Sequence, residues 1–178
     1  ELYVKENAYL RYSTTENWSK NMLNLNTKKA IVEKNGQVDW VTGSFGSKIS
    51  MLYPMSVLNG EGAKTEYTGI TFAGKGQNLD TGFKVVHNAP NTSSVVNSKS
   101  LSKNGGACTY RALVRIMENA TNSKCSVSCE SLMLDDINVL LFLIFLYDHR
   151  HCLMRYLHLI QVDHILDHVY IRHLFQYL

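Results

Sequence analysis

Polar and apolar residues alternate over short stretches along most of the chain, most clearly between residues 72 and 106. In that segment small hydroxyl residues alternate with β-branched or aliphatic ones, and the segment ends on Gly105-Gly106. A period of two with Gly-bounded ends is typical of short β-strands, and it leaves no room for a helix of useful length. The pattern therefore predicts stacked strands through the middle of the chain.

A loose repeat accompanies this alternation after Gly60. Four successive units place small residues and a turn before a short apolar strand, although their spacing is irregular. Such a repeat is expected of a solenoid in which each rung buries one face on the next. We expect stacked parallel strands from about Tyr67 to Leu134, with Gly60, Gly82 and Gly105-Gly106 at turns.

Two local signals predict where strands end in the first third of the chain. Asn35-Gly36 lies between two short apolar runs, and Asn-Gly is the strongest short signal for a β-hairpin. Pro54 follows a strand-like run at residues 48–53. Because Pro cannot donate a hydrogen bond to a central ladder, this strand is expected to end there.

The composition changes abruptly after Asn138. Residues 139–178 contain no Gly, Ala, Ser, Thr, Pro, Lys or Glu, and they hold six of the seven His. The longest apolar run, residues 139–147, falls short of the roughly 20 residues that a membrane-spanning helix needs. Since nothing in this segment stops a helix, we expect an unrelated His-rich tail that is helical or disordered.

The net charge and the cysteine content indicate which kinds of partner and cellular compartment to expect. The formal net charge is only +3 in 178 residues and is spread along the chain, which does not indicate a nucleic-acid partner. Four Cys without a secretory signal favour free thiols in a reducing compartment over a disulfide framework. We therefore expect neither a nucleic-acid nor a membrane partner. The chain begins with Glu1, and we expect it to be a fragment.

Residues 74–106, GKGQNLDTGFKVVHNAPNTSSVVNSKSLSKNGG, resemble the signature of the SufB/SufD family of iron–sulfur cluster assembly proteins. Within that family the segment is more similar to SufB than to SufD, which shares the fold. The resemblance covers about residues 1–136, including Asn17-Trp18, Tyr53-Pro54 and residues 110–114. It implies an all-β, right-handed parallel β-helix: residues 1–137 would be a fragment of its core, and residues 138–178 an aberrant tail.

The resemblance also implies a function and partners. SufB is a scaffold, not an enzyme, that holds a transient iron–sulfur cluster in a complex with the SufC ATPase and SufD or a second SufB. Sulfur would come from a cysteine desulfurase or sulfur-transfer protein, and the location would be the cytoplasm, with a plastid as the alternative. A phosphate-loop motif is absent around Lys75-Gly76, which fits an ATPase activity that resides in SufC.

A secreted β-solenoid that binds or cleaves polysaccharide is the alternative function. Such a protein would show clustered acidic residues and exposed aromatics along one face, whereas the acidic residues here are scattered.

Cys129 is the main candidate for chemistry, because Cys129-Glu130-Ser131-Leu132 resembles a SufB segment whose cysteine is implicated in cluster assembly. A thiolate is a natural ligand for iron and an acceptor for persulfide sulfur. A buried structural cysteine is the alternative. One thiolate cannot hold a cluster that normally takes about four ligands, so we expect a partner to supply the others and Cys129 to lie near a surface that SufD covers.

Three other residues are weaker candidates. Cys125 would share a strand face with Cys129 but lie about 13 Å away, too far for a disulfide or a shared metal ion. On a helix the same two cysteines could chelate one ion. Cys108 is interpreted as structural or incidental. His87 matches a family motif position and could be a metal ligand or proton shuttle, or could be hydrogen-bonded into a turn.

The tail allows two interpretations. His164 and His168 would share one face of a helix and could chelate one metal ion. Alternatively, a shifted reading of the codons for residues 142–145 and 153–159 can encode peptides that resemble SufB segments downstream of Cys129. We therefore hypothesise a frameshift near Asn138, in which case the histidines carry no function.

Overall fold

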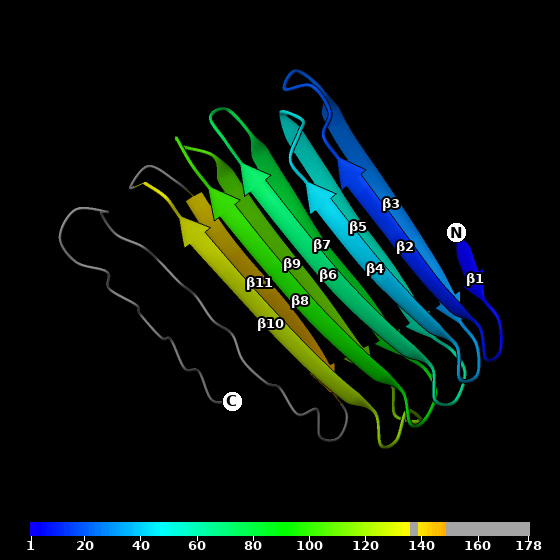
Figure 1. Cartoon of the computed structure of the whole chain (residues 1–178). Helices are drawn as coiled ribbons and strands as arrows, with labels where there is room; N and C mark the ends of the chain where they lie inside the picture. The colour runs from blue at the N-terminus through cyan, green and yellow to red at the C-terminus, as the bar shows by residue number, and fades with distance from the viewer. Residues whose placement is uncertain (136–138, 149–178) are drawn as a thin grey trace.

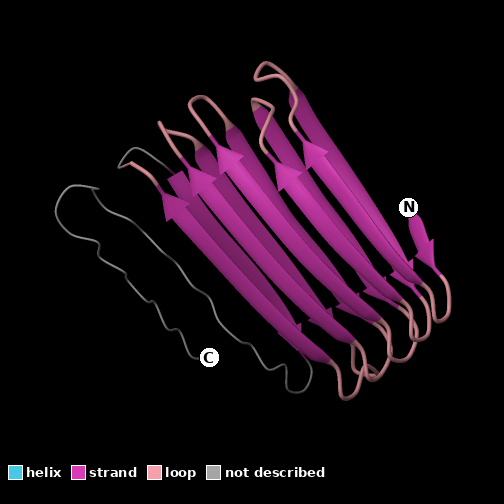
Figure 2. Ribbon diagram, viewed as in Figure 1, coloured by secondary structure: helices cyan, strands magenta, loops and turns pink. Residues whose placement is uncertain are grey.

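The computed structural model describes residues 1–135 and 139–148, the latter through their backbone alone, and all regular structure in these residues is β-strand (Figure 2). No helix in the described part is long and apolar enough to cross a membrane. The strands, labelled in Figure 1, are β1 (Leu2–Val4), β2 (Tyr9–Glu16), β3 (Leu23–Val32), β4 (Gln37–Ser44), β5 (Ile49–Leu58), β6 (Lys64–Ala73), β7 (Asn78–His87), β8 (Ser93–Ser102), β9 (Ala107–Ile116), β10 (Lys124–Met133) and β11 (Val139–Asp148).

Successive strands alternate between two sheets. One sheet has the order β1-β3-β5-β7-β9-β11 and the other the order β2-β4-β6-β8-β10. Neighbours such as β6 and β8 pair in parallel over ten residues. Figure 1 shows the two sheets as layers, with the chain crossing from one to the other after each strand. This arrangement confirms the predicted all-β parallel solenoid.

Alternation along β2 to β10 places about every second side chain in the lumen between the sheets. In β6, for example, Thr65, Tyr67 and Thr71 are buried while Lys64 and Glu66 are exposed. Large aromatic side chains fill the lumen. The rings of Tyr67 and Phe83 stack with centroids 4.7 Å apart, an arrangement that adds to the free energy gained by burying their area.

The turns on one side of the solenoid stack through asparagine. Asn7, Asn35 and Asn91 adopt positive φ angles, which Asn tolerates better than most residues. The backbone N–H of Asn35 donates to the carbonyl of Glu61 on the next rung, at 2.9 Å. The predicted hairpin at Asn35-Gly36 is therefore wrong, because this turn joins β3 and β4 of different sheets. Asn-Gly chemistry favours a turn without selecting the strand that is paired afterwards.

Gly60 and Gly105-Gly106 lie at or next to turns, as predicted, but Gly82 lies within β7. A Cβ atom on Gly82 would approach the carbonyl oxygen of Arg111 to 2.0 Å, so the close passage of β9 excludes any side chain here. Close backbone approach, and not a turn, explains this glycine.

The prediction that a strand ends at Pro54 is also wrong, because β5 runs on to Leu58. The register of β5 with β7 covers residues 49–52 and 55–58 and leaves out Tyr53 and Pro54. This gap lies beside Gly82, so the proline occupies a position where the ladder is already interrupted.

The expected helix or disorder after residue 138 is wrong for residues 139–148. They form β11, which pairs in parallel with β9 over ten residues. An apolar run without breakers suits a strand as well as a helix, and the exposed edge of β9 supplies a template for pairing. The tail histidines, Cys152 and residues 153–159 lie outside the described residues.

Replacing Gly82 by Ala should destabilise the chain by about 2 to 3 kcal/mol, because the added methyl group collides with backbone that cannot move aside. Gly74→Ala is the matched control, since a Cβ there would meet its nearest atom, Oε1 of Gln77, at 3.3 Å. Urea unfolding followed by circular dichroism measures both. Equal costs for the two variants would contradict the close approach at Gly82.

Candidate functional site

Cys129 lies in β10, the last described rung of its sheet, and faces the lumen. Its side chain is 0% exposed and belongs to the core cluster that contains Tyr67 and Tyr110. Burial raises the pKa of its thiol to about 12. The expected position near a surface is therefore wrong: in β10 the alternation turns Cys125, Val127, Cys129 and Ser131 inward.

Cys108 and Cys125, the other cysteines that the structure describes, do not assemble a metal site with Cys129. Cys125 and Cys129 lie on one strand and face the same side, separated by Val127, as the strand interpretation predicts. Cys108 is buried in β9, and its thiol donates to the carbonyl of Leu101 at 3.3 Å. Within the described residues no three His, Cys, Asp or Glu side chains lie close enough to hold a metal ion.

His87 ends β7 and is fully buried, with hydroxyl partners on both ring nitrogens. Its Nδ1 lies 2.7 Å from Oγ1 of Thr92, and its Nε2 lies 3.0 Å from Oγ of Ser94. Burial lowers the pKa of the imidazole to about 4, so the ring is neutral at pH 7. The contacts match the turn-bound alternative, and a metal ligand at this position would have to displace one of these hydroxyls.

One row of inward side chains connects Cys129 with the first rungs. The strand registers place Thr14, Thr42, Gly69, Ser98 and Cys129 side by side across β2, β4, β6, β8 and β10. Gly69 leaves a gap in the row that Tyr67 fills, because a Cβ on Gly69 would lie 2.4 Å from the tyrosine hydroxyl. Oγ1 of Thr42 donates to this hydroxyl at 3.1 Å. The row is thus hydroxyl-lined as far as the thiol.

A second hydroxyl row runs parallel to the first and begins at a carboxylate. It consists of Glu16, Ser44, Thr71, Ser100 and Ser131, again in register. Oγ of Ser100 donates to Oγ of Ser131 at 2.7 Å. Together the two rows make one half of the lumen polar.

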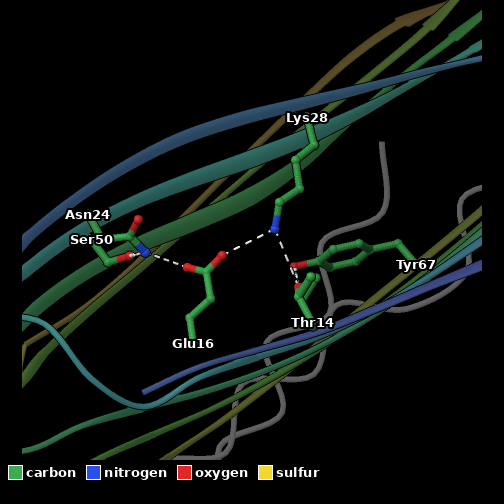
Figure 3. A network of polar contacts seen from close by, with 7 residues as sticks. Thr14, Glu16, Asn24, Lys28, Ser50 and Tyr67 are labelled. Atoms are coloured by element: carbon green, nitrogen blue, oxygen red, sulfur yellow. Dashed lines mark hydrogen bonds and ion pairs between the residues drawn. The ribbon is translucent and has the colours of Figure 1, made fainter. Parts of the chain in front are cut away.

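At the first rungs this polar half holds an ion pair (Figure 3). Nζ of Lys28 lies 3.1 Å from Oε1 of Glu16 and 3.4 Å from Oγ1 of Thr14. Nδ2 of Asn24 donates to Oε2 of Glu16 and, at 3.3 Å, to Ser50. The Lys28 and Glu16 side chains are only 13% and 9% exposed, so each charge depends on the other.

This group was not predicted from the sequence, because the usual alternation is inverted at the start of β3. Its outward residues Leu23 and Leu25 are 62% and 69% exposed, whereas Asn24 and Lys28 face the lumen. The ordinary rule that apolar residues face the core assigns these faces the wrong way round. The period-two pattern of Asn24, Asn26 and Lys28 was the available signal.

The outer faces carry paired acidic residues. Asp39 bonds with Arg11 at 3.3 Å, and Asp80 bonds with Arg111 at 2.9 Å. These carboxylates belong to different sheets and are each matched by an arginine. Among the described residues they do not form the acidic row expected of the polysaccharide alternative.

Residues 1–138 match the sequence profile of the family described as SUF system FeS cluster assembly, SufBD core domain. The iron–sulfur cluster assembly SufBD family proteins of Staphylococcus haemolyticus and Staphylococcus epidermidis are each 48% identical to this chain over 136 residues. A relative from Staphylococcus aureus shows the same identity. The chain therefore belongs to the SufBD family of the SUF iron–sulfur cluster assembly system.

The aligned segment covers 76% of this chain and 29% of each relative. The chain thus spans about 29% of the length of the curated relatives it matches. The matched profile includes every strand from β1 to β10 and both hydroxyl rows. Family membership favours iron–sulfur assembly over the polysaccharide alternative.

Replacing Lys28 by Met should cost about 3 kcal/mol of stability, because Glu16 would keep a buried charge without its cation. The double variant Glu16→Gln/Lys28→Met should recover at least half of that loss. Lys5→Met is the control, since the Lys5–Glu33 pair lies on the surface and should leave the urea midpoint unchanged. A Lys28→Met midpoint equal to that of Lys5→Met would contradict the coupling.

His87 should make the chain sensitive to acid. Its folded pKa of about 4 lies below the ordinary value of 6.5, so the unfolded chain binds the proton more tightly. The contribution to stability is complete above pH 6.5 and is lost as pH falls toward 4, by roughly 2 to 3 kcal/mol. Urea unfolding between pH 7 and 4.5 should show a shallower pH dependence for His87→Gln than for the unchanged chain. Parallel curves would contradict the prediction.

Proposed function

We propose that this chain is the β-solenoid core of a SufB-type scaffold, which holds a nascent iron–sulfur cluster as cargo and is not itself an enzyme. The observation that carries the proposal is the family match through β10, which includes the rung of Cys129. The resemblance of residues 74–106 to SufB supports that branch over SufD.

The architecture suits a scaffold. Long parallel ladders hold inward side chains at fixed positions along the axis, and the aromatic core resists local rearrangement. Positions on such strands are more precise than positions on loops, which favours the holding of a reactive sulfur over substrate-induced movement.

The partners follow from the number of ligands. A cluster normally takes about four ligands, whereas the described residues bring no three candidate ligands together. Further ligands would come from SufD, from a second SufB or from sequence outside the described residues. SufC would supply the ATPase activity, and a cysteine desulfurase or sulfur-transfer protein would supply the sulfur. Assembly would take place in the cytoplasm or in a plastid.

Cys129 is the residue we propose as sulfur acceptor or cluster ligand. Its support is the match of residues 129–132 to the family segment together with its place beside the hydroxyl rows. Because the thiol is buried and protonated at neutral pH, it would react only when the rung opens or when a partner draws the proton away.

In a full-length SufBD protein that carries this segment, Cys129→Ser should abolish cluster maturation while costing only about 1 to 2 kcal/mol of stability. Cluster formation is measured by iron and sulfide content and by visible absorption. Cys125→Ser is the matched control, since its side chain is also buried and faces the same lumen. Full maturation in the Cys129→Ser protein would remove the site assignment.

A further inference from the structure

The lumen around Cys129 contains hydroxyl groups for which a single thiol ligand would have no use. Ser98 is the direct neighbour of Cys129 on β8 and is 4% exposed. Adjacent inward residues on paired strands have Cβ atoms about 5 Å apart, close enough for the side chains to meet. Along β10 itself, the inward neighbours of Cys129 are the apolar Val127 and the hydroxyl residue Ser131.

The Tyr67 hydroxyl is held in place by two features. Gly69 lacks the side chain that would occupy the position of this hydroxyl. Thr42 donates to the tyrosine oxygen at 3.1 Å, so the proton of Tyr67 remains available to another acceptor. On the side of Gly69 opposite Thr42, the next residues in the row are Ser98 on β8 and then Cys129 on β10. The Tyr67 hydroxyl can therefore donate to an acceptor placed at the thiol end of the row.

Tyr67, Tyr110 and Cys129 lie close enough for the charge state of one to influence the pKa values of the others. The pKa of Tyr67 is raised to about 12, mainly by burial. The hydrogen bond from Thr42 lowers this pKa, and the charge that Cys129 would carry as a thiolate raises it. The same charge raises the pKa of Tyr110, after the larger effect of burial. Tyr67, Tyr110 and Cys129 also belong to one packed cluster.

We propose that Ser98 and Tyr67 are positioning residues for a persulfide on Cys129, with the outer sulfur atom lying in the hydroxyl row. This inference rests on the proposed function, and it specifies that the site holds the sulfur as a persulfide of Cys129. In the loading step a donor persulfide transfers its outer sulfur to the Cys129 thiol. The donor S–S bond breaks, a new S–S bond forms at Sγ, and the donor leaves as a thiol, so atoms and electrons balance.

The energetic reason is the cost of burying a polar sulfur. A persulfide adds one atom beyond Sγ and carries more negative charge than a protonated thiol. In an apolar lumen that charge would be uncompensated, whereas hydroxyl donors offset the loss of water. Ser98 would contact the outer sulfur, and Tyr67 would donate to Ser98 or to the sulfur itself.

The test uses this chain with inorganic polysulfide as the sulfur donor. Mass spectrometry of peptides locates the added sulfur on each cysteine, and dithiothreitol then removes it over time. Ser98→Ala and Tyr67→Phe should each speed the loss of sulfur from Cys129 at least threefold. Ser98→Thr retains the hydroxyl and should restore the original rate.

Two controls separate positioning from general loosening of the fold. Cys125 lies in register with Ser94 instead of Ser98, so its rate of sulfur loss should not change in the same samples. Ser94→Ala is the matched substitution and should leave the rate at Cys129 within twofold. Unchanged rates at Cys129, or equal acceleration at Cys125, would overturn the positioning role while leaving Cys129 as an acceptor. Because the thiol is buried, loading is carried out in mild urea that opens the last rung and is followed by refolding. Failure of Cys129 to take up sulfur under these conditions would overturn both.

Discussion

In-register stacking decides what each inward side chain of this solenoid contacts. Paired parallel strands lie about 4.8 Å apart, so a residue meets its counterparts on the rungs above and below before it meets anything else. Inward residues therefore form rows along the axis. A polar residue in such a row needs a polar neighbour in the same row, a partner across the lumen, as Thr71 has in Thr81, or a partner near a turn.

The two halves of the lumen meet this demand differently. On one side, Val32, Leu58, His87 and Ile116 form an almost apolar row, and His87 finds its partners in Thr92 and Ser94 near the turn. On the other side, hydroxyl residues follow one another from rung to rung, and Ser100 donates to its row neighbour Ser131. The apolar half supplies the stability that allows the polar half to exist, because buried polar rows contribute little net free energy.

The sequence predicted the local features and missed those that depend on neighbouring rungs. Period two is a property of a single strand, so the strands between Tyr67 and Leu134 and the shared face of Cys125 and Cys129 could be predicted. Pro54 and Gly82 depend on which strand passes beside them, and no local pattern contains that information. The burial of Cys129 likewise depends on the whole lumen.

The position of Cys129 depends both on the alternation within β10 and on the residues of the neighbouring rungs. A cysteine on the apolar side would be an inert core residue, as the bulk of buried cysteines are. Cys129 instead closes a row whose other members bear hydroxyls or, at Gly69, make room for one. The row begins beside the Glu16–Lys28 pair, another polar group that a purely structural core would replace by apolar residues at little cost. Both departures lie in the half of the lumen that contains Cys129, which supports the role proposed for this residue.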